Sequence, residues 1–291
     1  MEREKTGITA GEWYRKIEKL LKEAGGDSPA FDALCLLEDI GGVGRGGLPA
    51  AEKQTLSAQQ GERLREAADQ RAAGRPLQYI LGQWDFLTLT LSVGEGVLIP
   101  RPDTECLCLA AADRLKGSQS PRVLDLCAGS GCVGLGVASL VPGVQVTAVE
   151  LSEKALGYLQ ENIARYPDWQ VEAVQADILH DAGRFPDKVQ AILSNPPYIP
   201  RRDMPSLQRE VQWEPAMALD GGQGDGLLFY RAIASDWLDK LLPGGFCAVE
   251  VGIGQAASVA ALWKEHGLQD IRIFRDLGGI ERVVMGTAAR A

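Results

Sequence analysis

Histidine is scarce in this sequence of 291 residues, which contains only His180 and His266, each isolated and expected to be exposed or capping rather than catalytic. The 6 cysteines include no C-x-x-C pair, so we expect reduced, mostly buried thiols and no bound metal. No apolar stretch approaches the roughly 18 residues of a membrane-spanning helix, which favours a cytoplasmic protein. The formal net charge of -9 disfavours bulk nucleic acid as a partner, although a local basic patch such as Arg201-Arg202 remains. A protein or small-molecule substrate fits this balance better.

The usual nucleotide-binding motifs are also absent. An apolar run at residues 123–126, which includes Asp125, is typical of a buried strand. It leads into a turn made of Cys127, Ala128, Gly129, Ser130 and Gly131. A helical stretch follows, without the full dinucleotide fingerprint and without the Lys-Ser/Thr pair of a phosphate loop. Glycines still let backbone amides approach a ligand, and a helix N-terminus favours a carboxylate or phosphate. We therefore predict a ligand site of another kind at this turn.

Acidic residues stand at the ends of the next two strand-like runs. Glu150 lies 25 positions after Asp125, where an acid can hold the two hydroxyls of a ribose. The alternative is that Glu150 only caps the helix entered through Ser152. Asp177 and Ile178 follow the second run and suit an adenine, as an acid and an apolar neighbour. Together with the glycine turn, these positions predict a nucleoside ligand.

The segment Asn195-Pro196-Pro197-Tyr198 follows a further apolar run at residues 189–194. Open α/β sheets bind ligands at the carboxyl ends of their strands, which is where this segment falls. Two consecutive prolines fix φ and remove two backbone donors, so the carbonyls remain as acceptors beside the Asn195 amide and the Tyr198 ring. Such a loop suits a planar amide or amine. The alternative is an ordinary proline-rich turn that ends a strand.

These sites follow one another in order on successive predicted strands, and in this arrangement the chain resembles the class I S-adenosylmethionine-dependent methyltransferases. It resembles more closely the PrmC/HemK family of protein glutamine methyltransferases, over nearly the whole chain. The family pattern is also matched at residues 98–105, 214–215, 218–219, 242–245, 276–279 and 282–284. The chain departs from it at Cys127 and Ala128, where the family more often has Gly and Thr. An acid-glycine pair, which we align with Asp225-Gly226, comes one residue late.

The resemblance implies both a fold and a reaction. The fold is α/β: a Rossmann-like, doubly wound sheet of seven strands, the last antiparallel, with a small N-terminal helical domain. The reaction moves a methyl group from S-adenosyl-L-methionine to the side-chain amide nitrogen, N5, of the glutamine in the Gly-Gly-Gln motif of class I peptide chain release factors. We expect a monomer without membrane or nucleic-acid partners. The alternatives are a glutamine of a ribosomal protein, adenine N6 of DNA or RNA, or a catalytically inactive binding protein.

With this resemblance, the site residues are assigned as follows. The catalytic and substrate-binding residues are Asn195, Pro196, Pro197 and Tyr198. The cofactor-binding residues are Asp125, Cys127, Ala128, Gly129, Ser130, Gly131, Glu150, Asp177, Ile178 and Asn195. Arg101 and Glu105 are expected to close the cofactor pocket or to orient the helical domain. The alternative is that these two residues only form a salt bridge, because they stand four positions apart.

The chemistry implied for the loop does not need a dedicated base. An amide nitrogen is a poor nucleophile, so the site must orient its NH2 group toward the methyl group and accept its hydrogens. The Asn195 side-chain oxygen and the Pro196 carbonyl are the expected acceptors, while Pro197 and Tyr198 pack against the amide plane. The proton leaves after transfer, when the nitrogen is strongly acidic.

Two further segments have open interpretations. Glu214-Pro215 either borders the substrate channel or simply ends a loop. Gly221-Gly222-Gln223 reproduces the tripeptide that the family methylates in its substrates. It is either a pseudosubstrate, a self-methylated glutamine, or a coincidental glycine turn.

The first part of the chain predicts a helical domain. Thr9 with Glu12, and Ser57 with Gln60, match the capping box that begins a helix, and Ser28-Pro29 begins another between them. The apolar face of that middle helix is predicted at Phe31, Leu34 and Leu37. Glycine-rich residues 41–47 are predicted to be a loop.

We place the domain boundaries at residues 76 and 105. Residues 1–76 form the helical, substrate-recognition domain. Residues 77–105 form a linker with a β-hairpin, in which residues 86–91 alternate as one half-buried strand. Residues 106–291 form the methyltransferase domain, where strands and helices alternate from residue 123 onward, as in a doubly wound sheet.

Overall fold

The computed structural model describes residues 7–44 and 47–290, which fall into two compact units. The helical unit consists of Met1–Gly82 together with Arg209–Trp213, and the sheet unit consists of Gln83–Gln208 and Glu214–Ala291. Residues 1–6 of the predicted first domain, residues 45–46 of the predicted glycine loop, and residue 291 lie outside the described part.

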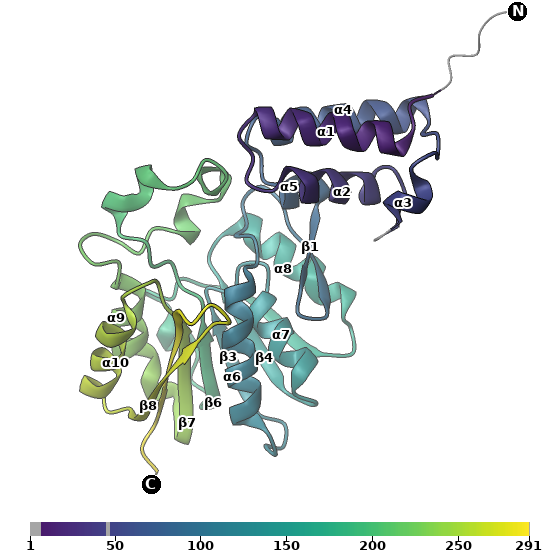
Figure 1. The fold of residues 1–291 in the computed structure, drawn as a ribbon. Helices are drawn as coiled ribbons and strands as arrows, with labels where there is room; N and C mark the ends of the chain where they lie inside the picture. Colours follow the sequence, from purple (N-terminus) through teal and green to yellow (C-terminus); the bar gives the residue numbers. More distant parts are fainter. Residues whose placement is uncertain (1–6, 45–46, 291) are drawn as a thin grey trace, which may run out of the picture. The chain divides into compact units, whose positions relative to one another are not determined.

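The helices of the helical unit are α1 (Ala10–Glu23), α2 (Pro29–Asp39), α3 (Leu48–Ala51), α4 (Ala58–Ala72) and α5 (Leu77–Leu81), as Figure 1 shows. The predicted capping boxes at the starts of α1 and α4 are confirmed, and Pro29 is the first residue of α2. α5 contacts α2 and α4, which explains why the helical unit extends to Gly82, beyond the predicted boundary at residue 76.

The core of the helical unit contains a buried ion pair beside its apolar side chains. The prediction that Phe31 belongs to the apolar face of α2 is wrong, because this ring is 53% exposed. Asp32 is buried instead and accepts a hydrogen bond of 2.7 Å from Nε of Arg71. Arg71 also donates to Oε1 of Glu210 at 2.5 Å. Two carboxylates therefore share one buried guanidinium.

The sheet unit begins with a two-stranded hairpin, β1 (Gln83–Phe86) and β2 (Leu89–Ser92). The prediction of a single strand at residues 86–91 is wrong, because Phe86 pairs with Leu89 and the chain turns between them. Leu87 adopts a left-handed φ of 52° in that turn. Leucine is an unusual residue for such a conformation, so no turn signal marks the position in the sequence.

A single large sheet forms the centre of this unit. Within the described residues it has seven strands in the order β5-β4-β3-β6-β7-β9-β8. Their bounds are β3 (Arg122–Leu126), β4 (Gln145–Glu150), β5 (Gln170–Gln175), β6 (Val189–Ser194), β7 (Leu241–Glu250), β8 (Gln269–Arg275) and β9 (Glu281–Thr287). β3 to β7 run parallel, whereas β9 is antiparallel to both of its neighbours. The predicted seven-stranded sheet with an antiparallel last strand is confirmed.

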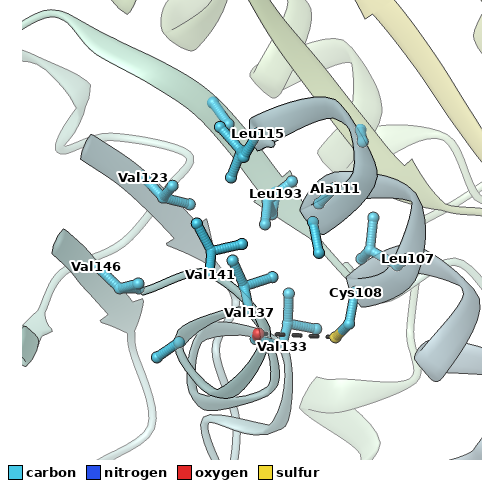
Figure 2. Close-up of a cluster of buried hydrophobic side chains, with 14 of the residues drawn as sticks. Leu107, Cys108, Ala111, Leu115, Val123, Val133, Val137, Val141, Val146 and Leu193 are labelled. Carbon is cyan, nitrogen blue, oxygen red and sulfur yellow. Dashed lines mark hydrogen bonds between the residues drawn. The ribbon is translucent and has the colours of Figure 1, made fainter. Parts of the chain in front are cut away.

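Helices cover both faces of the sheet, as a doubly wound fold requires. One face carries α6 (Glu105–Leu115) and α7 (Cys132–Leu140), with α8 (Glu153–Arg165) packed farther along toward β5. Figure 2 shows the side chains of α6 and α7 meeting Val123, Val146 and Leu193 from three parallel strands, and the thiol of Cys108 contacting the Val133 carbonyl at 3.7 Å. The opposite face carries α9 (Leu228–Ala232) and α10 (Ala256–Glu265).

Shorter segments complete the unit. They are the 3-10 turns η1 (Pro102–Thr104), η2 (Ala182–Arg184), η3 (Arg201–Ser206), η4 (Val211–Trp213), η5 (Ala216–Ala218) and η7 (Leu238–Lys240), and the π-turn η6 (Ile233–Trp237); of these, η4 belongs to the helical unit.

The cysteines are all free; Cys108 and Cys247 are buried and the others partly exposed. Across residues 7–44 and 47–290, no helix combines the length and the apolar composition needed to cross a membrane.

Candidate active site

The sequence motifs meet at one edge of the sheet. β3 and β6 are parallel neighbours that pair Leu126 with Ser194, so the glycine turn and Asn195 leave the sheet side by side. β4 ends at Glu150 next to β3, and β7 ends at Glu250 next to β6. The strand order reverses between β3 and β6. A crevice at the carboxyl ends of such a switch point is the usual ligand site of an open α/β sheet.

The glycine turn has the left-handed backbone that its sequence suggests. Cys127, Gly129 and Gly131 have φ values of 59°, 57° and 84°. A Cβ atom on Gly131 would lie 2.5 Å from Cδ1 of Leu159, so a larger residue there would displace that side chain. A Cβ atom on Gly129 would meet nothing within 4 Å. The Gly129 backbone therefore faces open space that a ligand can enter.

Glu150 links this turn to the next helix. Its Oε2 accepts a hydrogen bond of 2.8 Å from the Gly129 N–H, and its Oε1 accepts one of 2.7 Å from the Ser152 N–H. The Ser152 side chain is itself the N-cap of α8. Burial raises the pKa of Glu150, while these backbone bonds oppose the rise. Glu150 thus holds two backbone segments, and its remaining lone pairs can accept from hydroxyl groups.

Asp125 lies deeper than expected for a ligand-binding acid. Its side chain is fully buried, and its Oδ2 accepts a hydrogen bond of 2.8 Å from the Gly134 N–H in α7. Among the described residues, its Oδ1 has no hydrogen-bond partner. Burial raises the pKa of Asp125 to about 7. Asp125 therefore supports α7, whereas the buried Ala128 packs against Leu159 of α8 and the Ser130 carbonyl accepts a hydrogen bond from Asn162 of α8. Direct contact of these residues with a cofactor stays a prediction.

Asp177 and Ile178 are neighbours in the sequence but differ in exposure. The Asp177 side chain is 27% exposed, and its Oδ1 accepts a hydrogen bond of 2.9 Å from the Leu179 N–H. Ile178 is buried, and its carbonyl accepts a hydrogen bond of 2.8 Å from the Trp237 indole. Asp177 is thus accessible to a ligand, whereas Ile178 belongs to the core. The predicted contact between Ile178 and an adenine stays untested.

The loop after β6 contains two prolines, and the side-chain amide of Asn195 in this loop has a defined direction. Pro196 and Pro197 are buried. Nδ2 of Asn195 donates a hydrogen bond of 3.1 Å to Oγ1 of Thr104. The hydroxyl of Tyr198 donates to Oε1 of Glu250 at 3.4 Å. Because the Asn195 NH2 group is turned toward Thr104, the side-chain oxygen is turned away from it.

Thr104 and Glu250 were not singled out from the sequence. The Thr104 hydroxyl donates a hydrogen bond of 2.6 Å to Oε2 of Glu250, and both side chains are buried. Burial raises the pKa of Glu250 to about 7, against the lowering effects of the Thr104 bond and of Arg282. A signal existed, since Glu250 ends an apolar strand-like run just as Glu150 does.

Arg101 and Glu105 do not pair with each other. The Arg101 guanidinium forms an ion pair with the buried Glu214, which also accepts a hydrogen bond of 2.9 Å from the Ile99 N–H. Glu105 accepts a hydrogen bond of 3.0 Å from the Leu87 N–H. The alternative of a salt bridge between Arg101 and Glu105 is wrong. Glu214 does more than end a loop, because its carboxylate holds the segment before η1 in place.

Two models of known protein families match this chain. The family model described as "PrmC N-terminal domain" matches residues 12–82, and the model described as "Methyltransferase small domain" matches residues 106–214. The release factor glutamine methyltransferase of Geobacter sulfurreducens is 38% identical over 267 residues, which cover 91% of this chain and 92% of that protein. The chain belongs to the release factor glutamine methyltransferase family. The predicted family is confirmed.

Two solved structures resemble parts of this chain. A protein-(glutamine-N5) methyltransferase described as release factor-specific, from Alicyclobacillus acidocaldarius, is 35% identical over 68% of this chain and 99% of its own, with a TM-score of 0.43. The hMettl16 catalytic domain, solved with an RNA hairpin of the MAT2A 3′UTR, is 16% identical over 76% of this chain and 81% of its own, with a TM-score of 0.56. The second likeness shows a shared fold alone.

In this member of the release factor glutamine methyltransferase family, the internal Gly-Gly-Gln sequence has a packing explanation. A Cβ atom on Gly221 would lie 2.5 Å from the Gly226 carbonyl oxygen and 2.7 Å from Cα of Tyr198. Gly222 has a left-handed φ of 93°. Gln223 is exposed. These glycines let the segment pass close behind Tyr198, which favours the glycine-turn interpretation.

Neither histidine lies among the predicted site residues. The His180 side chain is 78% exposed, and Nδ1 of His266 contacts the Leu262 carbonyl at 3.0 Å. Over the described ranges, no group of three or more His, Cys, Asp or Glu side chains is arranged to hold a metal ion.

Proposed function

We propose that this chain transfers a methyl group from S-adenosyl-L-methionine to the side-chain amide nitrogen, N5, of the glutamine in the Gly-Gly-Gln motif of a class I peptide chain release factor. Family membership supports the reaction. The observation that carries the proposal is the Asn195 amide, fixed by Thr104 at the end of β6 beside the glycine turn. We also propose that the protein acts in the cytoplasm, where release factors work.

The residues around the glycine turn fit the proposed cofactor. The open space at Gly129 allows a ligand to approach the backbone, and α7 directs its positive N-terminal end toward a carboxylate. The Glu150 carboxylate suits the two ribose hydroxyls. When bound, S-adenosyl-L-methionine supplies a methyl group on a positively charged sulfur.

The loop after β6 suits the proposed acceptor. A glutamine amide has two N–H donors, and its lone pair is delocalised into the carbonyl. The Asn195 side-chain oxygen and the Pro196 carbonyl are two acceptors on one rigid segment. Hydrogen bonds to them strengthen as positive charge develops on the nitrogen, which stabilises the transition state more than the ground state. The surplus proton can leave afterwards without a dedicated base.

Enzymes that act on the rival substrates would also use a loop like the one after β6, so other features must distinguish these substrates. Relatives at 31–38% identity over most of the chain carry the name release factor glutamine methyltransferase, which favours a release factor over a ribosomal protein. An adenine in nucleic acid would have to be flipped out of its stack and held by a protein whose net charge is -9. A catalytically inactive binding protein would not need the acceptor pair.

The decisive experiment combines the purified protein, labelled S-adenosyl-L-methionine and a bacterial class I release factor. Peptide mass spectrometry should find one added methyl group on the glutamine of the factor's Gly-Gly-Gln loop. A factor in which that glutamine is replaced by asparagine is the matched control and should stay unlabelled. Transfer to a ribosomal protein or to adenine, with none to the release factor, would overturn the proposal.

A further inference from the structure

We propose that Thr104, held by the Glu250 carboxylate, is a positioning residue that sets which way the catalytic amide of Asn195 faces. The inference deepens the proposed function and rests on it. The three side chains come from the segment before α6, the end of β6 and the end of β7, and they form one continuous hydrogen-bonded chain. Nothing in the methyl-transfer chemistry itself requires the Thr104 hydroxyl.

The direction of this chain follows from what each group can donate. Above the raised pKa of Glu250 the carboxylate only accepts, so the single hydrogen of the Thr104 hydroxyl goes to Oε2 of Glu250, at 2.6 Å. The Thr104 oxygen is then left as an acceptor, and only the NH2 side of the Asn195 amide can satisfy it, at 3.1 Å. The Asn195 oxygen consequently faces the other way, where it can accept from a substrate amide. With the opposite orientation, Asn195 would present N–H groups to the N–H groups of the substrate.

Burial makes this chain a strong constraint. Thr104 is 1% exposed and Glu250 2% exposed, so solvent cannot replace either partner. The second Glu250 oxygen accepts from Tyr198, and the Glu250 backbone carbonyl accepts a hydrogen bond of 2.8 Å from the Tyr230 hydroxyl. Both ends of the Glu250 residue are therefore fixed.

Burial raises the pKa of Glu250 to about 7, and charged neighbours act on it in both directions. Arg282 lowers its pKa, and Asp103 raises it. Arg282 is itself held by ion pairs to Asp103 at 2.7 Å and to Asp276 at 2.9 Å. The guanidinium thus stays close to the chain that orients Asn195.

The test compares Thr104→Val with Thr104→Ser. Valine keeps the shape of threonine but removes the hydroxyl, whereas serine keeps the hydroxyl and removes a methyl group. Thr104→Val should lower kcat for release-factor methylation roughly 10- to 100-fold, which is less than the roughly 100- to 1,000-fold loss typical of a hydrogen bond made directly to the reacting group. KM for the release factor and Kd for S-adenosyl-L-methionine should change less than about threefold. Thr104→Ser should keep kcat within about threefold of the wild type.

A second measurement needs no activity. Hydrogen exchange of the Asn195 side-chain NH2 group, followed by NMR in the unliganded protein, should be slow in the wild type and in Thr104→Ser and faster in Thr104→Val. If Thr104→Val does not fold, Thr104→Ala provides the same comparison with serine.

The outcomes separate this inference from the proposed function. A wild-type protein that does not methylate the release factor refutes the function, and the exchange measurement still decides the orientation of Asn195. A methylating wild type with equal kcat in Thr104→Val overturns the inference. So does a serine variant as slow as the valine variant, or a rise in KM without a fall in kcat.

Discussion

At the scale of single residues, the proposed methyl transfer depends most directly on the side chain of Asn195. Asn195→Ala removes one acceptor for the substrate amide, so kcat should fall at least about 100-fold. Cofactor affinity should change less than about threefold, because binding is expected to rest on the glycine turn and Glu150. Methyl-transfer assays and calorimetry measure the two quantities.

The matched control for this prediction is Gln223→Ala, which removes an exposed amide from the internal Gly-Gly-Gln sequence. This variant should keep wild-type turnover. An Asn195→Ala protein with near-normal kcat would show that the loop after β6 does not hold the acceptor.

Cys127 carries backbone strain at the start of the glycine turn. Its φ of 59° costs an L-residue on the order of 1 kcal/mol. We expect Cys127→Gly to be about 1 kcal/mol more stable than Cys127→Ala in urea unfolding, since both remove the thiol and only glycine relieves the strain. Equal stability of the two variants would contradict the strain.

The site was predictable where it depends on local pattern and strand order. Residues that follow parallel strands must meet at the same edge of a sheet, so Glu150, Asp177 and Asn195 could be placed from sequence. The bond between Thr104 and Glu250 joins positions 146 apart, and no local pattern indicates it. The burial of Asp125 also depends on how α7 covers β3, which periodicity does not reveal.

At the scale of elements, the packing of α2, α4 and the segment Arg209–Trp213 depends on the buried charge of Arg71. Arg71→Ala leaves Asp32 buried without its cationic partner, so the free energy of unfolding should fall by about 3–5 kcal/mol. The double variant Arg71→Met with Asp32→Leu should recover most of that loss, because both buried charges are removed and the remaining carboxylate, Glu210, is 38% exposed. Chemical denaturation followed by circular dichroism measures both values. A double variant as unstable as Arg71→Ala would contradict this account.

Elements with strong local signals were predicted, and elements that depend on tertiary contacts were not. The capping boxes of α1 and α4 are complete within four residues, so sequence alone locates these helix starts. α3 and α5 are too short to form without neighbouring contacts. The buried side of α2 includes Asp32, which an apolar pattern cannot find because its partner lies 39 positions away. The hairpin turn at Leu87 has no glycine or asparagine to mark it.

At the scale of the whole molecule, two buried carboxyl groups connect stability to pH. Burial raises the pKa of Asp125 and of Glu250 to about 7, from ordinary values of 3.8 and 4.5. The folded state therefore binds these protons more tightly than the unfolded state. Their contribution to stability is complete below the unfolded-state pKa values and is lost as the pH rises through about 7.

Asp125→Asn isolates one of these groups. Between about pH 5 and pH 8, the variant should gain roughly 2 kcal/mol of stability relative to the wild type, because asparagine needs no proton to remain neutral. Urea unfolding at a series of pH values provides the comparison. Stability curves that run parallel over this range would show that Asp125 does not titrate there.

The segment Arg209–Trp213 gives the helical unit a discontinuous origin in the chain. Glu210 brings a carboxylate to Arg71 from a part of the sequence that lies between β6 and β7. The N-terminal helices consequently cannot be exchanged as a complete unit by a gene fusion with a single junction. Grafting the first 82 residues onto another methyltransferase would omit a piece of their own fold, so such a graft must carry Arg209–Trp213 as well.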